Sequence, residues 1–234
     1  MNNSAKHTRV NDILLGPLER PALKWLAAHS PTWLTPDICT VIGVLGGVII
    51  LVGYILSNYN PAFFWLATFG YIVNWYGDSL DGTLARYRKI ERPVYGFFID
   101  HTTDAATQVL IFVGLGLSPY ISLTVACLTL VGYLLLSVLV YIRTFVINEF
   151  KISYSKLGPT EVRLLAVLLN TVMFFFGMKL WPVELGNLGS IALNPYDLAL
   201  GIVSLILVFF FLTTAIQEGR RLRAAGVPMN SDIH

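Results

Sequence analysis

The hydrophobic positions of the chain form long uninterrupted runs. Residues 38–77 and 105–142 contain no Asp, Glu, Lys, Arg or His, and each run is long enough for two membrane spans of about 20 residues. Turn-forming residues interrupt the runs at 58–61 and 118–119. The pattern predicts an all-α, polytopic membrane protein with six transmembrane helices. They are expected at residues 37–57, 61–85, 93–117, 120–148, 160–181 and 196–219.

Residues 9–28 mix apolar and charged side chains and are too polar to cross a membrane. This pattern predicts an N-terminal amphipathic helix in the membrane interface, and a cytosolic segment packed on the helix ends is the alternative. The expected organisation is an interfacial helix within residues 1–30, a six-helix transmembrane domain at 31–225 and a C-terminal tail at 226–234.

Composition supports a membrane protein and argues against other classes. Hydrophobic residues make up 55% of the 234 residues and charged residues 13%, about half the charged share of a soluble domain. The net charge of +2 gives no reason to expect a nucleic-acid partner. Cys39 and Cys127 lie in apolar stretches, which is typical of small buried side chains and not of disulfides or zinc sites.

Lysine and arginine gather in segments that six spans would place on one side of the membrane. These segments precede the first span, join spans two and three, join spans four and five, and follow span six. The positive-inside rule therefore predicts that both termini are cytoplasmic. Lys179 is the clear exception on the opposite side.

Four aspartates stand where predicted spans two and three approach the cytoplasmic surface. Asp78 and Asp81 are three residues apart, and Asp100 and Asp104 are four apart, so each pair shares a helix face. A short basic turn joins the two helices, and both pairs are expected to meet. A divalent cation such as Mg²⁺, Mn²⁺ or Ca²⁺ would relieve the repulsion, and the cluster could hold two ions. Ion pairs with nearby arginines are the structural alternative.

Small residues and one arginine accompany these acids. Gly82 and Ala85 follow the first acidic pair, and Gly96 comes one helical turn before Asp100. A missing side chain allows a helix or a ligand to approach the backbone closely. Arg86 supplies a fixed positive charge suited to a phosphate. Together these residues predict a site for a metal-bound phosphate compound.

The order of these residues resembles the signature of the CDP-alcohol phosphotransferase family, D-x-x-D-G-x-x-A-R followed by G-x-x-x-D-x-x-x-D. All eight fixed residues are present within residues 78–104. The six-span layout and Thr35-Pro36-Asp37 are also similar to the family. Two details differ: nine residues separate the halves of the signature where the family usually has eight, and Asp37 stands where it often has Asn.

The resemblance implies a membrane enzyme of phospholipid biosynthesis that transfers a phospho-alcohol group from a CDP-linked donor to an acceptor hydroxyl and releases CMP. It further implies a lipid substrate, membrane-lipid surroundings, a homodimer, a site near the cytoplasmic face, and Mg²⁺ or Mn²⁺ as cofactor, with two ions. Asp104 would act as the base. The implied metal ligands are Asp78, Asp81, Asp100 and Asp104. The implied nucleotide-binding residues are Asp78, Asp81, Gly82, Ala85 and Arg86, with Gly96 as a structural residue of the motif.

The identity of the alcohol is less clearly indicated. Gly-Pro-Thr-Glu at 158–161 and His101 are similar to ethanolamine and choline phosphotransferases, which favours CDP-ethanolamine or CDP-choline with a diacylglycerol-like acceptor. Thr160 and Glu161 also fit an ordinary helix start. The alternative is a CDP-diacylglycerol donor with glycerol phosphate, inositol phosphate or serine as acceptor. A metal or proton transporter is the alternative of another class. The candidate acceptor or head-group residues are His101, Glu161, Arg163 and Lys156.

Overall fold

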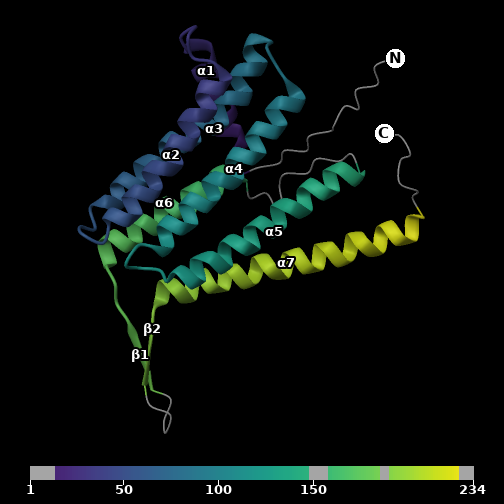
Figure 1. The fold of residues 1–234 in the computed structure, drawn as a ribbon. Helices are drawn as coiled ribbons and strands as arrows, with labels where there is room; N and C mark the ends of the chain where they lie inside the picture. Colours follow the sequence, from purple (N-terminus) through teal and green to yellow (C-terminus); the bar gives the residue numbers. More distant parts are fainter. Residues whose placement is uncertain (1–13, 148–157, 185–189, 227–234) are drawn as a thin grey trace.

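Figure 1 shows the computed structural model of the chain, which describes residues 14–147, 158–184 and 190–226. Helices dominate these parts, so the all-α prediction is confirmed, and a small hairpin of two strands is added. The helices are α1 (Gly16–His29), α2 (Pro36–Leu56), α3 (Phe63–Arg88), α4 (Pro93–Gly116), α5 (Leu123–Ile147), α6 (Pro159–Phe176) and α7 (Pro195–Ala225). The strands are β1 (Trp181–Glu184) and β2 (Ser190–Leu193).

The predicted helix starts lie within three residues of the observed ones, whereas two helix ends differ by five and six residues. α6 ends at Phe176 and not at residue 181, because the following Gly177 has φ of +63°, a left-handed value that ends the helix. The antiparallel strands β1 and β2 occupy part of the segment that follows. α7 continues through the basic residues beyond position 219 and ends at Ala225.

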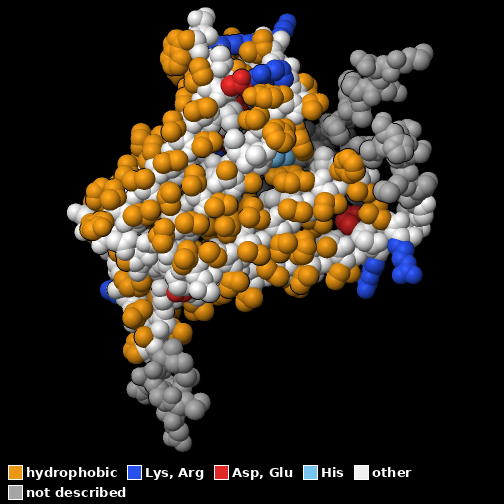
Figure 2. All heavy atoms as spheres, in the orientation of Figure 1, with side chains coloured by type: hydrophobic (Ala, Val, Ile, Leu, Met, Phe, Trp, Pro, Cys, Tyr) orange, Lys and Arg blue, Asp and Glu red, His pale blue; other side chains and the backbone are white. Residues whose placement is uncertain are grey.

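Four of the described helices, α2, α5, α6 and α7, are long and apolar enough to cross a membrane. α3 and α4 form the helices predicted as spans two and three but carry the charged signature, so the count of six spans stays a prediction. Apolar side chains cover much of the face seen in Figure 2, and many large ones are exposed. These features indicate an integral membrane protein.

α2 packs tightly against α3 because glycines remove side chains at the contact. A Cβ atom on Gly46 would lie 2.4 Å from the backbone nitrogen of Asn74, and one on Gly77 would lie 2.2 Å from the backbone nitrogen of Gly43. These distances leave no room for a methyl group. The close packing brings the first turns of α2 against the acidic end of α3.

α1 packs on α3 with one face and exposes the other. Leu23 and Ala27 are buried in a cluster that includes Leu80 and Leu84 of α3. The opposite face exposes the large apolar side chains of Leu18 and Trp25, and Leu14, just before the helix, is exposed as well. This pattern supports the interfacial helix, which stays a prediction, and residues 9–13 of the predicted segment lie outside the described residues.

Two glutamates fix the start of α1 to α3 and α6. Glu19 Oε1 accepts hydrogen bonds from Trp75 Nε1 at 2.8 Å and from Thr160 Oγ1 at 2.7 Å. Glu161 Oε1 accepts a hydrogen bond from the backbone N–H of Leu15 at 2.8 Å. The first turn of α6 is therefore held against α1.

α5 and α7 lie side by side and diverge from α1, α2 and α3 (Figure 1). Arg143 of α5 and Glu218 of α7 form an ion pair at 2.8 Å, with both side chains only 16% exposed. α5 also packs against α4. The pair of helices thus forms the far wall of the cavity described next.

Candidate metal and phosphate site

A cavity of about 2630 Å³ is lined by residues of all seven helices, α1 to α7. One part of its wall carries the signature residues at the end of α3 and the start of α4. The wall further along α4, α5, α6 and α7 is largely apolar and includes Ile111, Leu115, Leu136, Leu169, Leu200 and Leu207. A cavity with these two kinds of lining suits an amphiphilic ligand.

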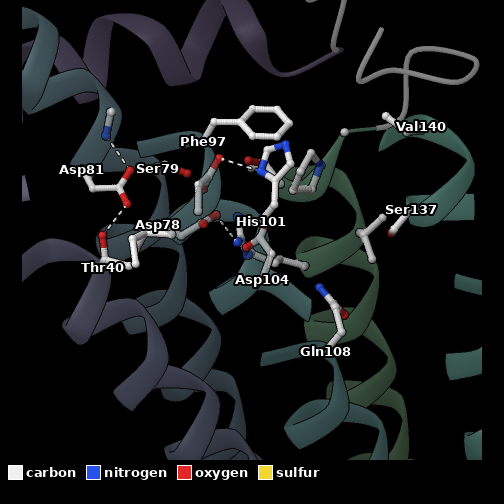
Figure 3. Close-up of a pocket in the computed structure, with 18 of the residues that line it drawn as sticks. Thr40, Asp78, Ser79, Asp81, Phe97, His101, Asp104, Gln108, Ser137 and Val140 are labelled. Atoms are coloured by element: carbon white, nitrogen blue, oxygen red, sulfur yellow. Dashed lines mark hydrogen bonds and ion pairs between the residues drawn. The ribbon is translucent and has the colours of Figure 1, made fainter. Parts of the chain in front are cut away.

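Three of the four signature carboxylates converge at this wall. One oxygen from each of Asp78, Asp100 and Asp104 lies within 4.8 Å of the other two. Figure 3 shows Asp78 of α3 and Asp104 of α4 facing the same space. The acidic ends of both helices therefore meet at one centre, to which α3 contributes Asp78 and α4 contributes Asp100 and Asp104.

Asp81 lies outside this group of three. Its Oδ2 accepts a hydrogen bond from Thr40 Oγ1 of α2 at 2.8 Å, and its Oδ1 accepts the backbone N–H of Gly82 (Figure 3). The carboxylate lines the same cavity but is held toward α2. Its predicted role as a metal ligand stays a prediction.

Arg163 of α6 contacts the acidic centre that α3 and α4 form. Its guanidinium forms an ion pair with Asp78, and its Nε donates to Asn74 Oδ1 at 2.8 Å. The Asn74 amide donates in turn to the carbonyl of Gly43 at 2.9 Å. Asn74 is 4% exposed, so a buried chain of hydrogen bonds fixes the arginine relative to α2 and α3.

His101 lies beside Asp100 and between two aromatic rings. Its Nδ1 is 3.2 Å from Asp100 Oδ2. The imidazole is tilted against Phe97, with ring centroids 4.1 Å apart, and stacked on Tyr141 at 4.9 Å. These contacts hold the ring at the edge of the acidic centre, where Figure 3 shows it lining the cavity.

The remaining predicted residues divide into those in the cavity wall and those outside it. Gly82, Ala85, Arg86 and Gly96 line the cavity. Glu161 is 5% exposed, and both of its oxygens accept backbone N–H groups, from Leu15 and Gly158. It therefore caps the start of α6 and anchors α1. Lys156 lies outside the described residues.

The donor set of the acidic centre fits a hard divalent cation. Three carboxylates supply oxygen ligands of the kind that Mg²⁺ and Mn²⁺ prefer. Arg163 supplies one positive charge against these three negative charges. The remaining imbalance favours further cations at this place.

Two residues that hold the site were missed by sequence reasoning. Asn74 precedes Asp78 by one helical turn, and this i, i+4 spacing inside a charge-free run could have identified it. Thr40 carries no comparable signal, because its contact with Asp81 depends on how α2 is rotated against α3.

The two departures from the family's signature meet at the rim of the cavity. Arg92, in the short connection between α3 and α4, forms an ion pair with Asp37 at 2.5 Å and lies over the ring of Tyr95 at 4.2 Å. The hydrogen bond to Asp37 raises the pKa of Arg92 above its ordinary value. Both side chains are about half exposed, and such a pair adds little stability.

Comparisons with known proteins identify a family and relatives of this chain. Residues 33–210 match the family described as CDP-alcohol phosphatidyltransferase. Cholinephosphotransferase 1 of Danio rerio is 27% identical over 177 residues, covering 70% of this chain and 44% of that protein. Cholinephosphotransferase 1 of Gallus gallus is 28% identical over 188 residues, covering 75% and 54%. The chain thus spans about half the length of these relatives.

A solved structure shares the fold. The crystal structure of apo phosphatidylinositol phosphate synthase from Mycobacterium tuberculosis superposes with a TM-score of 0.55 at 18% identity, covering 83% of this chain and 94% of that one. At this identity the likeness concerns the fold alone. The match over residues 33–210, which contains the complete signature and all three converging carboxylates, shows that the chain belongs to the CDP-alcohol phosphatidyltransferase family.

Proposed function

We propose that the protein is a membrane-bound, divalent-metal-dependent CDP-alcohol phosphotransferase of phospholipid biosynthesis. The observation that carries the proposal is the convergence of Asp78, Asp100 and Asp104 within 4.8 Å at the polar part of a cavity that is otherwise largely apolar. A CDP-linked donor needs its diphosphate charge neutralised, and a lipid substrate needs an apolar wall beside the reacting group.

The reaction forms one phosphorus–oxygen bond and breaks another. The acceptor hydroxyl oxygen attacks the phosphorus next to the alcohol, and the bond from this phosphorus to the bridging oxygen breaks and releases CMP. Asp104 takes the hydroxyl proton. When bound at the three carboxylates, Mg²⁺ or Mn²⁺, with room for two ions, supplies the positive charge that neutralises the diphosphate.

The arginines and small residues provide binding and orientation. Arg86 lies in the cavity wall near Gly82 and Ala85, where its charge suits the nucleotide phosphate. Arg163 fixes Asp78 through their ion pair and offers its guanidinium to a phosphate or head group. We include Asp81 as a ligand of metal or nucleotide and His101 as a head-group contact.

The favoured donor is CDP-ethanolamine or CDP-choline, with a diacylglycerol-like acceptor. The two cholinephosphotransferase relatives support this branch, and so does the placement of His101 beside Asp100. The alternative branch uses a CDP-diacylglycerol donor with a soluble acceptor. Both branches use the same acidic centre and the same apolar wall, so the donor must be decided by assay.

Membrane placement and assembly belong to the same proposal. The six helices α2 to α7 span the membrane, α1 lies in the interface, and both termini and the site face the cytoplasm. Two copies form a homodimer. Residues 31–225 form the catalytic domain, residues 1–30 hold the interfacial helix, and residues 226–234 are the tail. A detergent-corrected mass equal to one chain would contradict the homodimer.

The test is CMP release by the purified full chain in mixed micelles of detergent and lipid. CDP-ethanolamine, CDP-choline and CDP-diacylglycerol are each supplied with their acceptors and with Mg²⁺ or Mn²⁺. We expect release with one donor class, loss of release with EDTA, and recovery on adding back metal. Asp104→Asn should abolish release, and the matched variant Asp197→Asn should retain it, because Asp197 contacts the backbone N–H of Ser122 away from the acidic centre.

Two outcomes would contradict the proposal. CMP release that persists in Asp104→Asn would remove the assigned base. Metal-dependent ion flux into liposomes, without CMP release from any of the three donors, would favour the transporter alternative.

A further inference from the structure

Gln108 is a polar side chain in the apolar part of the cavity wall. It follows Asp104 by four residues on α4, which places it one helical turn, about 6 Å, deeper along the same face. The wall around this level contains Ile111, Phe112 and Leu136. Figure 3 shows the Gln108 side chain beyond Asp104 and directed into the cavity toward the side of Ser137 on α5.

The Gln108 amide has no hydrogen-bonding partner within the described part of the chain. Other polar side chains in the deeper part of the cavity wall are bonded to protein groups: Ser137 Oγ donates to the carbonyl of Tyr133, and Thr129 Oγ1 to that of Val125. Gln108 is half-buried, and its amide lines the cavity, so its N–H groups can donate to a molecule bound there. Because the neighbouring wall is apolar, a ligand group that accepts a hydrogen bond at this depth would find its polar partner in this amide.

The distance from Asp104 restricts the kind of acceptor group. In the proposed reaction, which this inference rests on, the reacting hydroxyl or phosphate lies at the carboxylates. The ester carbonyls of a diacylglycerol lie only a few bonds from its free hydroxyl, and its acyl chains continue into apolar surroundings. Gln108 lies one helical turn from Asp104, so a lipid whose hydroxyl is at Asp104 would have such a carbonyl beside Gln108. A CDP-diacylglycerol donor carries the same ester carbonyls at a similar separation from its diphosphate.

We propose that the Gln108 amide N–H donates a hydrogen bond to an ester carbonyl of the diacyl lipid substrate, and that Gln108 thereby selects ester-linked over ether-linked glycerolipids. The selected chemistry is the same whether the lipid is the acceptor or the CDP-linked donor. Gln108 is a specificity residue and takes no part in proton transfer.

The experiment compares ester and ether lipids with the full chain in micelles. One arm offers diacylglycerol or dialkylglycerol as acceptor with CDP-choline and CDP-ethanolamine, and the other offers CDP-diacylglycerol or CDP-dialkylglycerol with soluble acceptors. The wild type should show a KM about fivefold lower for the ester lipid, the effect of one neutral hydrogen bond. Gln108→Met keeps the length and removes the donor, so it should lose this preference and leave the KM for the ether lipid unchanged.

Ser137→Ala is the matched control, since its hydroxyl lies at the same wall but is bonded to its own helix. It should keep the ester preference. Equal KM values for ester and ether lipids in the wild type, or an ester preference that survives in Gln108→Met, would overturn the assignment.

Lipid binding is measured beside turnover, by competition against a fluorescent diacylglycerol. An ester preference in binding that Gln108→Met removes, without CMP release from any donor, would refute the proposed reaction and support the role of Gln108. CMP release with no ester preference would refute the role of Gln108 alone.

Discussion

Replacement of Arg163 by Met removes the positive charge paired with the acidic centre. Arg163 and Asp78 are only 12% and 20% exposed in their side chains, so solvent screens this charge less than it screens a surface pair. The Arg163 guanidinium opposes any divalent cation that binds to Asp78, Asp100 and Asp104. We expect Arg163→Met to bind Mn²⁺ more tightly than the wild type.

The size of the effect follows from the charges. At an effective dielectric constant of about 20, a unit charge about 5 Å from a divalent ion contributes roughly 7 kcal/mol. Water in the cavity and relaxation of the side chains reduce this value. A fifth of it still corresponds to about a tenfold increase in affinity.

The assay is titration of purified protein with Mn²⁺, followed by electron paramagnetic resonance of the free ion. Arg163→Lys keeps the charge and should remain close to the wild type. Arg92→Met removes a cation that is about half exposed and paired with Asp37, and it should also leave the Mn²⁺ affinity unchanged. Thermal unfolding adds a second measurement: Arg163→Met should unfold at a lower temperature than the wild type in EDTA, and saturating Mn²⁺ should narrow this difference.

One result would refute this reasoning. Unchanged or weaker Mn²⁺ binding by folded Arg163→Met would mean that the arginine acts mainly by holding Asp78 in position. The positive charge of Arg163 would then not determine the affinity of the site for Mn²⁺.

Two further predictions concern the helix packing behind the site. Gly46→Ala should lower the free energy of unfolding by about 1–3 kcal/mol, because its Cβ would lie 2.4 Å from the backbone of Asn74. Gly201→Ala is the control, since a Cβ on Gly201 meets nothing within 4 Å. Equal thermal midpoints for the two variants would contradict the close α2–α3 contact. Tyr54→Phe should cost about 1–3 kcal/mol, because Tyr54 is fully buried and its hydroxyl donates to Asn170 at 2.9 Å. Denaturant unfolding in micelles should separate it from Tyr59→Phe, since Tyr59 is 83% exposed.

The helices could be predicted because charge-free runs show where they lie and turn residues mark where they end. The hairpin could not, since Met178, Leu180 and Trp181 continue the apolar character of α6. The helix ends where Gly177 takes a positive φ, and a glycine in an apolar run is equally compatible with a continuing helix. The predicted end of the last helix at residue 219 is too early, because the apolar span ends there whereas α7 continues through charged residues to Ala225.

The sequence could predict which aspartates share a helix face. It could not predict how each helix is rotated about its own axis against its neighbours. Spacings of three and four residues place Asp78 with Asp81 and Asp100 with Asp104, yet the rotation of α3 directs Asp81 toward Thr40 of α2. The role of Glu161 depends in the same way on tertiary packing. The sequence indicated a helix start there, and the structure adds the bond to Leu15 from a distant part of the chain.

The contacts at the start of α1 have a consequence for biosynthesis. Leu15 and Glu161 are separated by 146 residues, and Glu19 and Thr160 by 141. A chain that emerges from the ribosome in order makes α1 before α6, so these partners of α1 arrive only when α6 is made. α1 therefore completes its contacts long after its own synthesis. α3 alone already covers Leu23 and Ala27 of α1, so a ribosome-bound chain that stops before residue 159 should protect the start of α1 from proteolysis less well than a chain that includes all of α6.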